Sequence, residues 1–173
     1  MNRYLFFFII VLFIGCDKTE DNIFTQTPDE RLKATADEYR EALFSAPNGW
    51  FLAVDTKKDG AYRLWMSFEE NERVGMLSDM DATFSKAGET SVVPCISSWR
   101  LKALLAPSLI FDTYSYLHIL ADPQGANNGG SNSEGLISDF EFRIVDTDNG
   151  GINLIGNYNG RLARMDRATP EEA

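Results

Sequence analysis

His118 is the only histidine in the chain, and it is therefore the only side chain whose ordinary pKa lies near neutrality. Ser115 precedes it by three residues, and Asp112 and Asp122 lie nearby, so the residue types of a nucleophile, a base and an orienting carboxylate are all present. A serine and a histidine on one short helix rarely point at a common substrate atom, however. The spacing favours a histidine that packs a helix, and we predict no catalytic residue here.

Acidic side chains could support two other kinds of chemistry. The 26 Asp and Glu residues always permit a carboxylate pair of the kind that hydrolyses glycosidic bonds, so a carboxylate-dependent hydrolase is an alternative function. Residues 146–151, with the sequence DTDNGG, are similar to a calcium loop, but Gly150 occupies the fifth position and no acidic residue follows at the twelfth. The pattern favours a hairpin turn, and we expect neither a metal nor a cofactor.

Aromatic side chains provide the stronger argument for binding. Trp50, Tyr62, Trp65 and Trp99 lie in or beside expected strands, and flat aromatic faces commonly bind sugar rings or apolar ligands. Trp65 is the clearest case because strand alternation points it away from the apolar face of its own strand. The alternative is that it packs under the N-terminal helix, or that both faces of the sheet are covered. We take these four residues as candidate ligand-binding residues for a glycan or a small apolar ligand.

The first element that must position these residues is a helix beginning at Pro28. Thr27 can cap it, proline suits the first helical position, and Asp29 and Glu30 place negative charge at the positive end of the helix dipole. One apolar stripe recurs at helical spacing, formed by Leu32, Ala36, Tyr39 and Leu43. This pattern predicts one amphipathic helix that ends within 46–49.

After Gly49 the hydrophobic period falls from about 3.6 residues to about 2. Eight short segments are expected as strands, at 50–56, 62–69, 73–79, 97–104, 109–112, 138–146, 152–157 and 161–165. Short, evenly spaced strands separated by turn-forming clusters are typical of an antiparallel meander. We therefore predict a mainly β (α+β) fold, with one N-terminal helix followed by about eight strands that form a barrel or a sandwich.

Two segments interrupt the strands. Residues 113–121 predict a short inserted helix, capped by Asp112 or Thr113 and ended by Pro123. Residues 124–135 contain a single apolar side chain, which offers little burial to offset the entropy of ordering them. We expect a mobile surface loop with fast amide exchange.

The start of the chain carries the signature of export. Residues 4–14 are apolar and uncharged, a stretch too short to span a bilayer, which needs about 20 residues, but suited to a secretory signal peptide. Residues 12–16, LFIGC, resemble the lipobox of bacterial lipoproteins, in which the cysteine receives the lipid. We predict a signal peptide at 1–15, lipidation of Cys16 and a tether at 16–27. The alternative is an ordinary signal peptide in which Cys16 is incidental.

Charge and cysteine content limit the partners. A net charge of −10 has the wrong sign for a nucleic-acid binder. The acidic residues that follow Cys16 resemble the export signals of surface lipoproteins, although a solvated linker explains them equally well. We expect an outer-membrane lipoprotein exposed on the cell surface, bound to the membrane by its anchor. Cys95 has no partner once Cys16 is lipidated, so we interpret it as a small core side chain.

The remainder of the chain is expected to be one mainly β domain at 28–166 followed by a frayed tail at 167–173. The tail, ATPEEA at 168–173, repeats the threonine, proline and acidic residues that open the N-terminal helix. Four residues after a capping threonine cannot form a stable helix, because nucleation is costly and isolated helices below roughly 12 residues are marginal. The repetition predicts that the chain is the N-terminal part of a longer ancestor.

Five motifs in order carry a family resemblance. They are ERL at 30–32, SAPNGW at 45–50, SWRLK at 98–102, FDTYSYLH at 111–118 with DP at 122–123, and DFEF at 139–142. Together they resemble the Bacteroidetes lipoproteins of domain of unknown function family 4302. The resemblance implies an envelope lipoprotein without an established activity, often encoded near outer-membrane uptake systems. We therefore expect a lipid-anchored, non-enzymatic binding or accessory module of such a system, or alternatively a structural partner of an outer-membrane transporter.

Overall fold

The computed structural model describes residues 26–80, 94–103 and 106–172 of the chain. The expected signal peptide, the lipidation site Cys16 and nearly all of the tether lie outside these ranges. Within them, no helix combines the length and the apolar character needed to cross a membrane.

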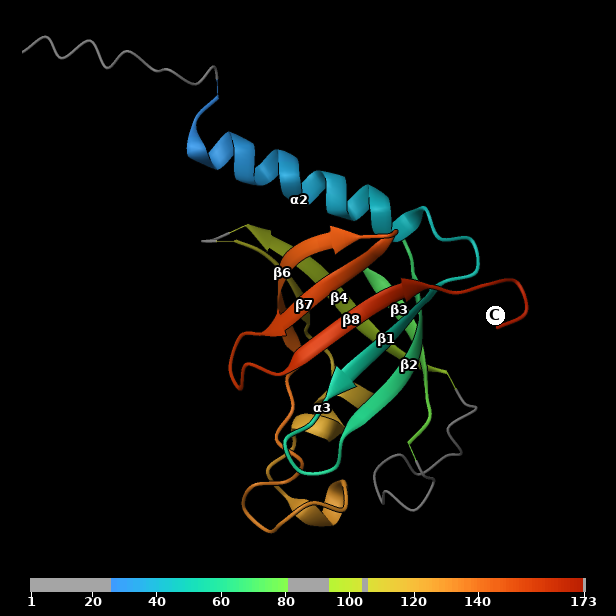
Figure 1. The fold of residues 1–173 in the computed structure, drawn as a ribbon, viewed down its shortest axis with the longest axis vertical. Coiled ribbons are helices and arrows are strands. Elements are labelled where there is room, and N and C mark those ends of the chain that lie inside the picture. The colour runs from blue at the N-terminus through green and yellow to red at the C-terminus, as the bar shows by residue number, and fades with distance from the viewer. Residues whose placement is uncertain (1–25, 81–93, 104–105, 173) are drawn as a thin grey trace, which may run out of the picture.

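Eight antiparallel strands close into a barrel in which each strand pairs with the next and β8 pairs with β1 (Figure 1). The strands are β1 (Trp50–Asp55), β2 (Ala61–Phe68), β3 (Arg73–Ser78), β4 (Cys95–Ala103), β5 (Pro107–Phe111), β6 (Glu141–Asp148), β7 (Gly151–Gly156) and β8 (Leu162–Arg167). This arrangement confirms the mainly β meander and decides for a barrel over a sandwich. Closure pairs the two outermost strands of the meander with each other.

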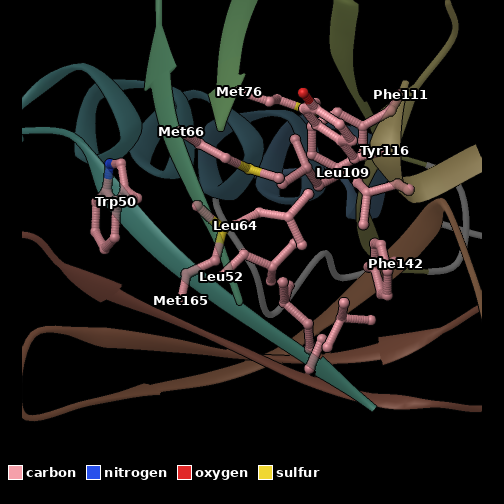
Figure 2. Close-up of a cluster of buried hydrophobic side chains, with 14 of the residues drawn as sticks. Trp50, Leu52, Leu64, Met66, Met76, Leu109, Phe111, Tyr116, Phe142 and Met165 are labelled. Atoms are coloured by element: carbon pink, nitrogen blue, oxygen red, sulfur yellow. The ribbon is translucent and has the colours of Figure 1, made fainter. Parts of the chain in front are cut away.

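The interior of the barrel is filled by side chains from alternate strand positions. In β1, for example, Trp50, Leu52 and Val54 are buried while the residues between them are half-buried on the outer face. Figure 2 shows large apolar side chains from several strands meeting in the core. Those without any exposed surface include Leu52, Leu64, Met66, Met76, Phe142 and Met165. Eight strands leave an interior just wide enough for such side chains to fill.

Helix α2 (Pro28–Phe44) lies across one end of the barrel (Figure 1). Its start has the expected cap, because the Thr27 hydroxyl accepts a hydrogen bond from the Glu30 amide at 3.2 Å, and the Glu30 carboxylate accepts one from the Thr27 amide at 2.8 Å. At the other end of the helix, the Trp50 indole donates to the Leu43 carbonyl at 2.9 Å. The helix is thereby joined directly to β1.

Helix α3 (Tyr116–Ala121) lies at the opposite end and begins later than expected. Both residues expected to cap it have other partners from β4. The Asp112 carboxylate accepts a hydrogen bond from Arg100 at 2.7 Å, and the Thr113 hydroxyl lies 2.6 Å from that of Ser98. The helix therefore starts after Ser115, whose side chain makes no capping bond. Hydrogen bonds to β4 thus move the first residue of the helix away from the position that the local sequence favours.

Residues 124–135 are held by hydrogen bonds that the expectation of a mobile loop did not consider. Asn128 is fully buried, and its side-chain amide donates to the carbonyls of Ile119 at 2.8 Å and Asp122 at 2.9 Å. Its side-chain oxygen accepts from the Gly130 amide at 3.1 Å. Hydrogen bonds to a buried amide thus take the place of the missing apolar contacts.

Candidate functional site

A pocket of about 580 Å³ opens at the α3 end of the barrel. We call it the end pocket, and its lining comes from the end of α3 and Pro123, from Glu134 and 137–141, and from 157–159. Its volume lies within the range of pockets that hold small ligands, roughly 300–1,000 Å³. The mouth of a β-barrel is also a common place for such a site.

One side of the end pocket is a rigid turn between β7 and β8. Asp139 is 2% exposed, and its carboxylate accepts three backbone hydrogen bonds, from Tyr158 at 3.0 Å, Asn159 at 2.7 Å and Arg161 at 3.0 Å. Gly156 makes room for this carboxylate, because a Cβ atom there would lie 1.9 Å from Asp139 Oδ2. The turn is therefore fixed in place before any ligand arrives.

The fixed turn presents an aromatic ring to solvent. Tyr158 is 93% exposed, although a tyrosine ring is a large apolar surface to leave in water. Asn157 and Asn159 flank it, and the Asn159 side chain donates to the Ser138 carbonyl at 2.7 Å. A ring face beside amide groups is an arrangement that suits a ligand with both apolar faces and hydroxyl groups.

The lining of the end pocket also contains a strained residue. Ile137 has a φ of 59°, a backbone conformation that β-branched residues rarely adopt. The Lys57 amide holds this conformation by donating to the carbonyls of Leu136 at 3.1 Å and Ile137 at 3.2 Å, and Lys58 pairs with Glu134 at 2.9 Å. Backbone strain of this kind concentrates at ligand sites, where the surrounding structure enforces it.

Phe140 lines the end pocket and stacks on His118 with ring centroids 4.2 Å apart. Burial lowers the pKa of His118, while the negative charge of Asp112 raises it in part. His118 Nδ1 lies 3.1 Å from the Ser115 hydroxyl, so the structure does bring these two residues together. Ser115 is 1% exposed, however, and its hydroxyl has no route to a substrate. The pair therefore supports the wall of the pocket.

Two of the carboxylates at the end pocket already have partners. Asp139 holds the turn, and the ion pair with Lys58 lowers the pKa of Glu134. A glycosidase needs a carboxyl group whose pKa is raised so that it can act as an acid. The shift at Glu134 has the opposite sign. Across the described parts of the chain, no group of three or more His, Cys, Asp or Glu side chains could hold a metal ion.

The four aromatic residues singled out from sequence do not meet at one site. Trp50 and Trp99 are each 1% exposed and belong to the core, where Phe44 packs edge-on against Trp99 at 5.7 Å. Neither residue can present a ring face to a ligand. Both pack in the core and do not have the ligand-binding role that was expected for them. The Tyr62 hydroxyl donates to Asp59 at 2.7 Å at the α3 end, and burial raises the pKa of Tyr62.

Trp65 points outward, as alternation predicted, and lies beside its register partners Phe51 and Leu77. These side chains line a hollow of about 400 Å³, which we call the β1–β3 groove. The indole nitrogen of Trp65 donates to the Asn48 carbonyl at 2.8 Å. The ring is thus held on the outer face of the sheet and is not covered by α2.

The last described residues reach the same groove. Ala168 is buried and its amide donates to the Gly49 carbonyl at 3.0 Å, so the start of the expected tail is attached to the barrel. Thr169 then donates to the Glu172 carboxylate from its backbone amide, at 3.0 Å, and Glu172 lines the β1–β3 groove.

Sequence reasoning missed Tyr158. Its signal was an aromatic residue inside the turn sequence NYNG at 157–160, which resembles an ordinary hairpin connection. Only the buried carboxylate of Asp139, 19 residues earlier in the chain, distinguishes this turn from a flexible one.

Fold and site together define a small antiparallel β-barrel with one end covered by a helix and a ligand-sized pocket at the other. The family model described as "Domain of unknown function (DUF4302)" matches residues 20–173. The chain therefore belongs to this family. Searches of curated proteins and of solved structures found no match.

Proposed function

We propose that this protein is a non-enzymatic glycan-binding module. The observation that carries the proposal is Tyr158, an aromatic ring held in solvent at the edge of the end pocket by three hydrogen bonds to a buried carboxylate. Fixing a contact surface in advance reduces the entropy lost on binding. A ring exposed on a rigid turn contributes little to the packing of the protein itself, but a bound ligand would pack against it.

The chemistry of the end pocket favours a neutral sugar. A pyranose ring has apolar C–H faces that stack on an aromatic ring, and equatorial hydroxyls that bind amides and carboxylates. Tyr158 and Phe140 offer apolar surface, while Asn157, Asn159 and Glu141 offer polar groups. The nearby carboxylates would repel an anionic ligand, so a phosphate or a uronic acid would bind poorly.

The sequence at the start of the chain supports a proposal about where this activity takes place. We propose that Cys16 carries a lipid which anchors the barrel in the cell envelope, with 17–27 as the tether. Binding would then serve an outer-membrane uptake system as an accessory that holds glycans at the cell surface. The LFIGC sequence at 12–16 supports the anchor, and the family membership is consistent with it.

The test is affinity electrophoresis of the purified chain in gels that contain starch, xylan, mannan or laminarin. Wild-type protein is expected to be retarded by at least one of these, and Tyr158→Ala should weaken that binding at least tenfold, about 1.4 kcal/mol. Ile96→Ala is the matched control, because Ile96 is an exposed apolar residue on β4, away from the pocket. Retardation of Tyr158→Ala equal to wild type would contradict the proposal.

The same samples distinguish a binder from the alternative hydrolase. A carboxylate-dependent hydrolase would release reducing ends from the retarding polysaccharide during incubation. The ion pair at Glu134 and the structural use of Asp139 support binding without cleavage. Release of reducing ends that is lost in Glu141→Gln would favour the hydrolase.

A second candidate is a structural partner of an outer-membrane transporter, and the β1–β3 groove favours it. Phe51, Trp65 and Leu77 lie side by side on the outside of the barrel, where partly exposed apolar side chains mark protein contacts. A photo-crosslinker placed at Leu77 is expected to label a transporter in intact cells under this function. The same crosslinker at Ile96 is the control.

A further inference from the structure

We propose that the ligand is a chain that runs from the end pocket across the β7–β8 turn onto the outside of the barrel. This rests on the proposed glycan binding and names its substrate class, an extended neutral oligosaccharide bound along its length. The observation behind it is a second hollow, of about 470 Å³, on the outer faces of β6, β7, β8 and β1. We call it the outer groove.

The outer groove and the end pocket lie next to each other at the end of β7. Ile155 lines the outer groove and Asn157 lines the end pocket. Asn157 follows the last residue of β7, and its amide donates to the Glu141 carbonyl at 2.8 Å, so the pairing with β6 extends to the edge of the end pocket. On β8, Leu162 pairs in register with Ile155 and follows the turn that carries Tyr158. One ligand can therefore contact both hollows without leaving the surface.

Exposed apolar side chains follow this path. Tyr158 at 93%, Leu162 at 60% and Val145 at 49% exposure all line one of the two hollows. Val145 is turned outward at a β-bulge, where the register between β6 and β7 shifts. Apolar side chains clustered in this way on a surface usually mark a binding face.

Polar groups in the outer groove are already oriented. Arg164 donates to the Asn153 side chain at 2.8 Å and to Asp166 at 2.9 Å, which fixes its guanidinium group across the groove. Asp55 and Asp146 add acceptors. Hydroxyl groups along a sugar chain can bind to such fixed donors and acceptors while its apolar faces cover Leu162 and Val145.

The charges along the path disfavour the binding of negatively charged polymers. The end pocket contributes three carboxylates and the outer groove two, against the single guanidinium of Arg164 in the two linings. An anionic polysaccharide, a nucleic acid or an acidic peptide would be repelled. A neutral, hydroxyl-rich chain meets neither this repulsion nor the cost of burying an unpaired charge.

The experiment is calorimetric titration of the purified full-length chain with neutral malto-, cello-, xylo- and manno-oligosaccharides, from disaccharides to octasaccharides. Wild-type affinity for the preferred series should rise about tenfold between the shortest and the longest ligand, a gain of about 1.4 kcal/mol. Leu162→Ser should lose this gain and keep the affinity for the shortest ligand. We expect Leu162→Ser to fold normally, because the Leu162 side chain is exposed.

The control is Ile96→Ser, because Ile96 is 62% exposed and lies on β4, across the barrel from β8. It should keep the full dependence on length. Equal behaviour of Leu162→Ser and Ile96→Ser overturns the extended path. Binding that depends on Tyr158 but not on ligand length overturns it too, and leaves the proposed function intact. Failure of wild type to bind any series overturns both.

Discussion

The two ends of the barrel are closed by different interactions. At the α2 end, Trp50, Trp99 and Phe44 pack in apolar contacts, with indole nitrogens bonded to backbone carbonyls. At the α3 end, Asn128 and Asp139 organise loops by hydrogen bonds, Ile137 is strained and Tyr158 is left in solvent. Apolar closure provides stability without a place for a ligand. Polar closure holds loops rigidly while leaving surface free, so we locate function there.

Truncating a large side chain at the α2 end should have the largest effect on stability. Trp99→Ala removes a buried ring that packs against Phe44 and Phe68, and should lower the free energy of unfolding by about 4 kcal/mol. Glycan affinity of the folded fraction should not change, because the α3 end is untouched. Urea denaturation and titration calorimetry measure the two quantities. A loss of affinity in the folded fraction would show that the two ends are coupled.

At the α3 end, removing the carboxylate that holds the turn should affect stability and binding together. Asp139→Ala leaves three backbone amides without their acceptor, so we expect a loss of about 3 kcal/mol and at least tenfold weaker binding. Tyr158→Ala is the matched comparison, because it should weaken binding with a change in stability below about 0.5 kcal/mol. Asp139→Ala with normal affinity would mean that the turn needs no prior fixing.

Relieving the strain at Ile137 should raise stability. Asparagine tolerates the left-handed backbone, so Ile137→Asn should increase the free energy of unfolding by about 1 kcal/mol. Ile137→Val keeps the β-branch and is the control that should gain nothing. Thermal unfolding monitored by circular dichroism gives the comparison. A destabilised Ile137→Asn would show that the side chain contributes more by packing than its backbone costs.

The smallest effect concerns pH and His118. Because burial lowers the pKa of His118, folding favours the neutral ring. This contribution is therefore complete above the unfolded pKa of about 6.5 and decreases as the pH falls below it. Between pH 7 and pH 5 the wild type should lose stability, and His118→Gln should remove this part of the slope. Equal slopes in the two proteins would assign the loss to other groups.

Much of the fold was predictable because it depends on local pattern. The alternation in β2 placed Leu64 and Met66 inside and Trp65 outside, and the Thr27 and Pro28 sequence fixed the start of α2. The meander was also predictable, because consecutive strands usually pair with each other. In the candidate site, the packing role of His118 followed from its place between apolar residues on a short helix.

The rest was decided by contacts between residues distant in sequence. Closure of the sheet required β8 to pair with β1, more than 100 residues away, and a meander pattern is equally compatible with a sandwich. The same applies to Trp50 and Trp99, whose burial depends on where α2 lies. Asp139 and Tyr158 form a site only because the barrel brings them together. The same turn sequence can be rigid or flexible, and the buried carboxylate beside it decides which.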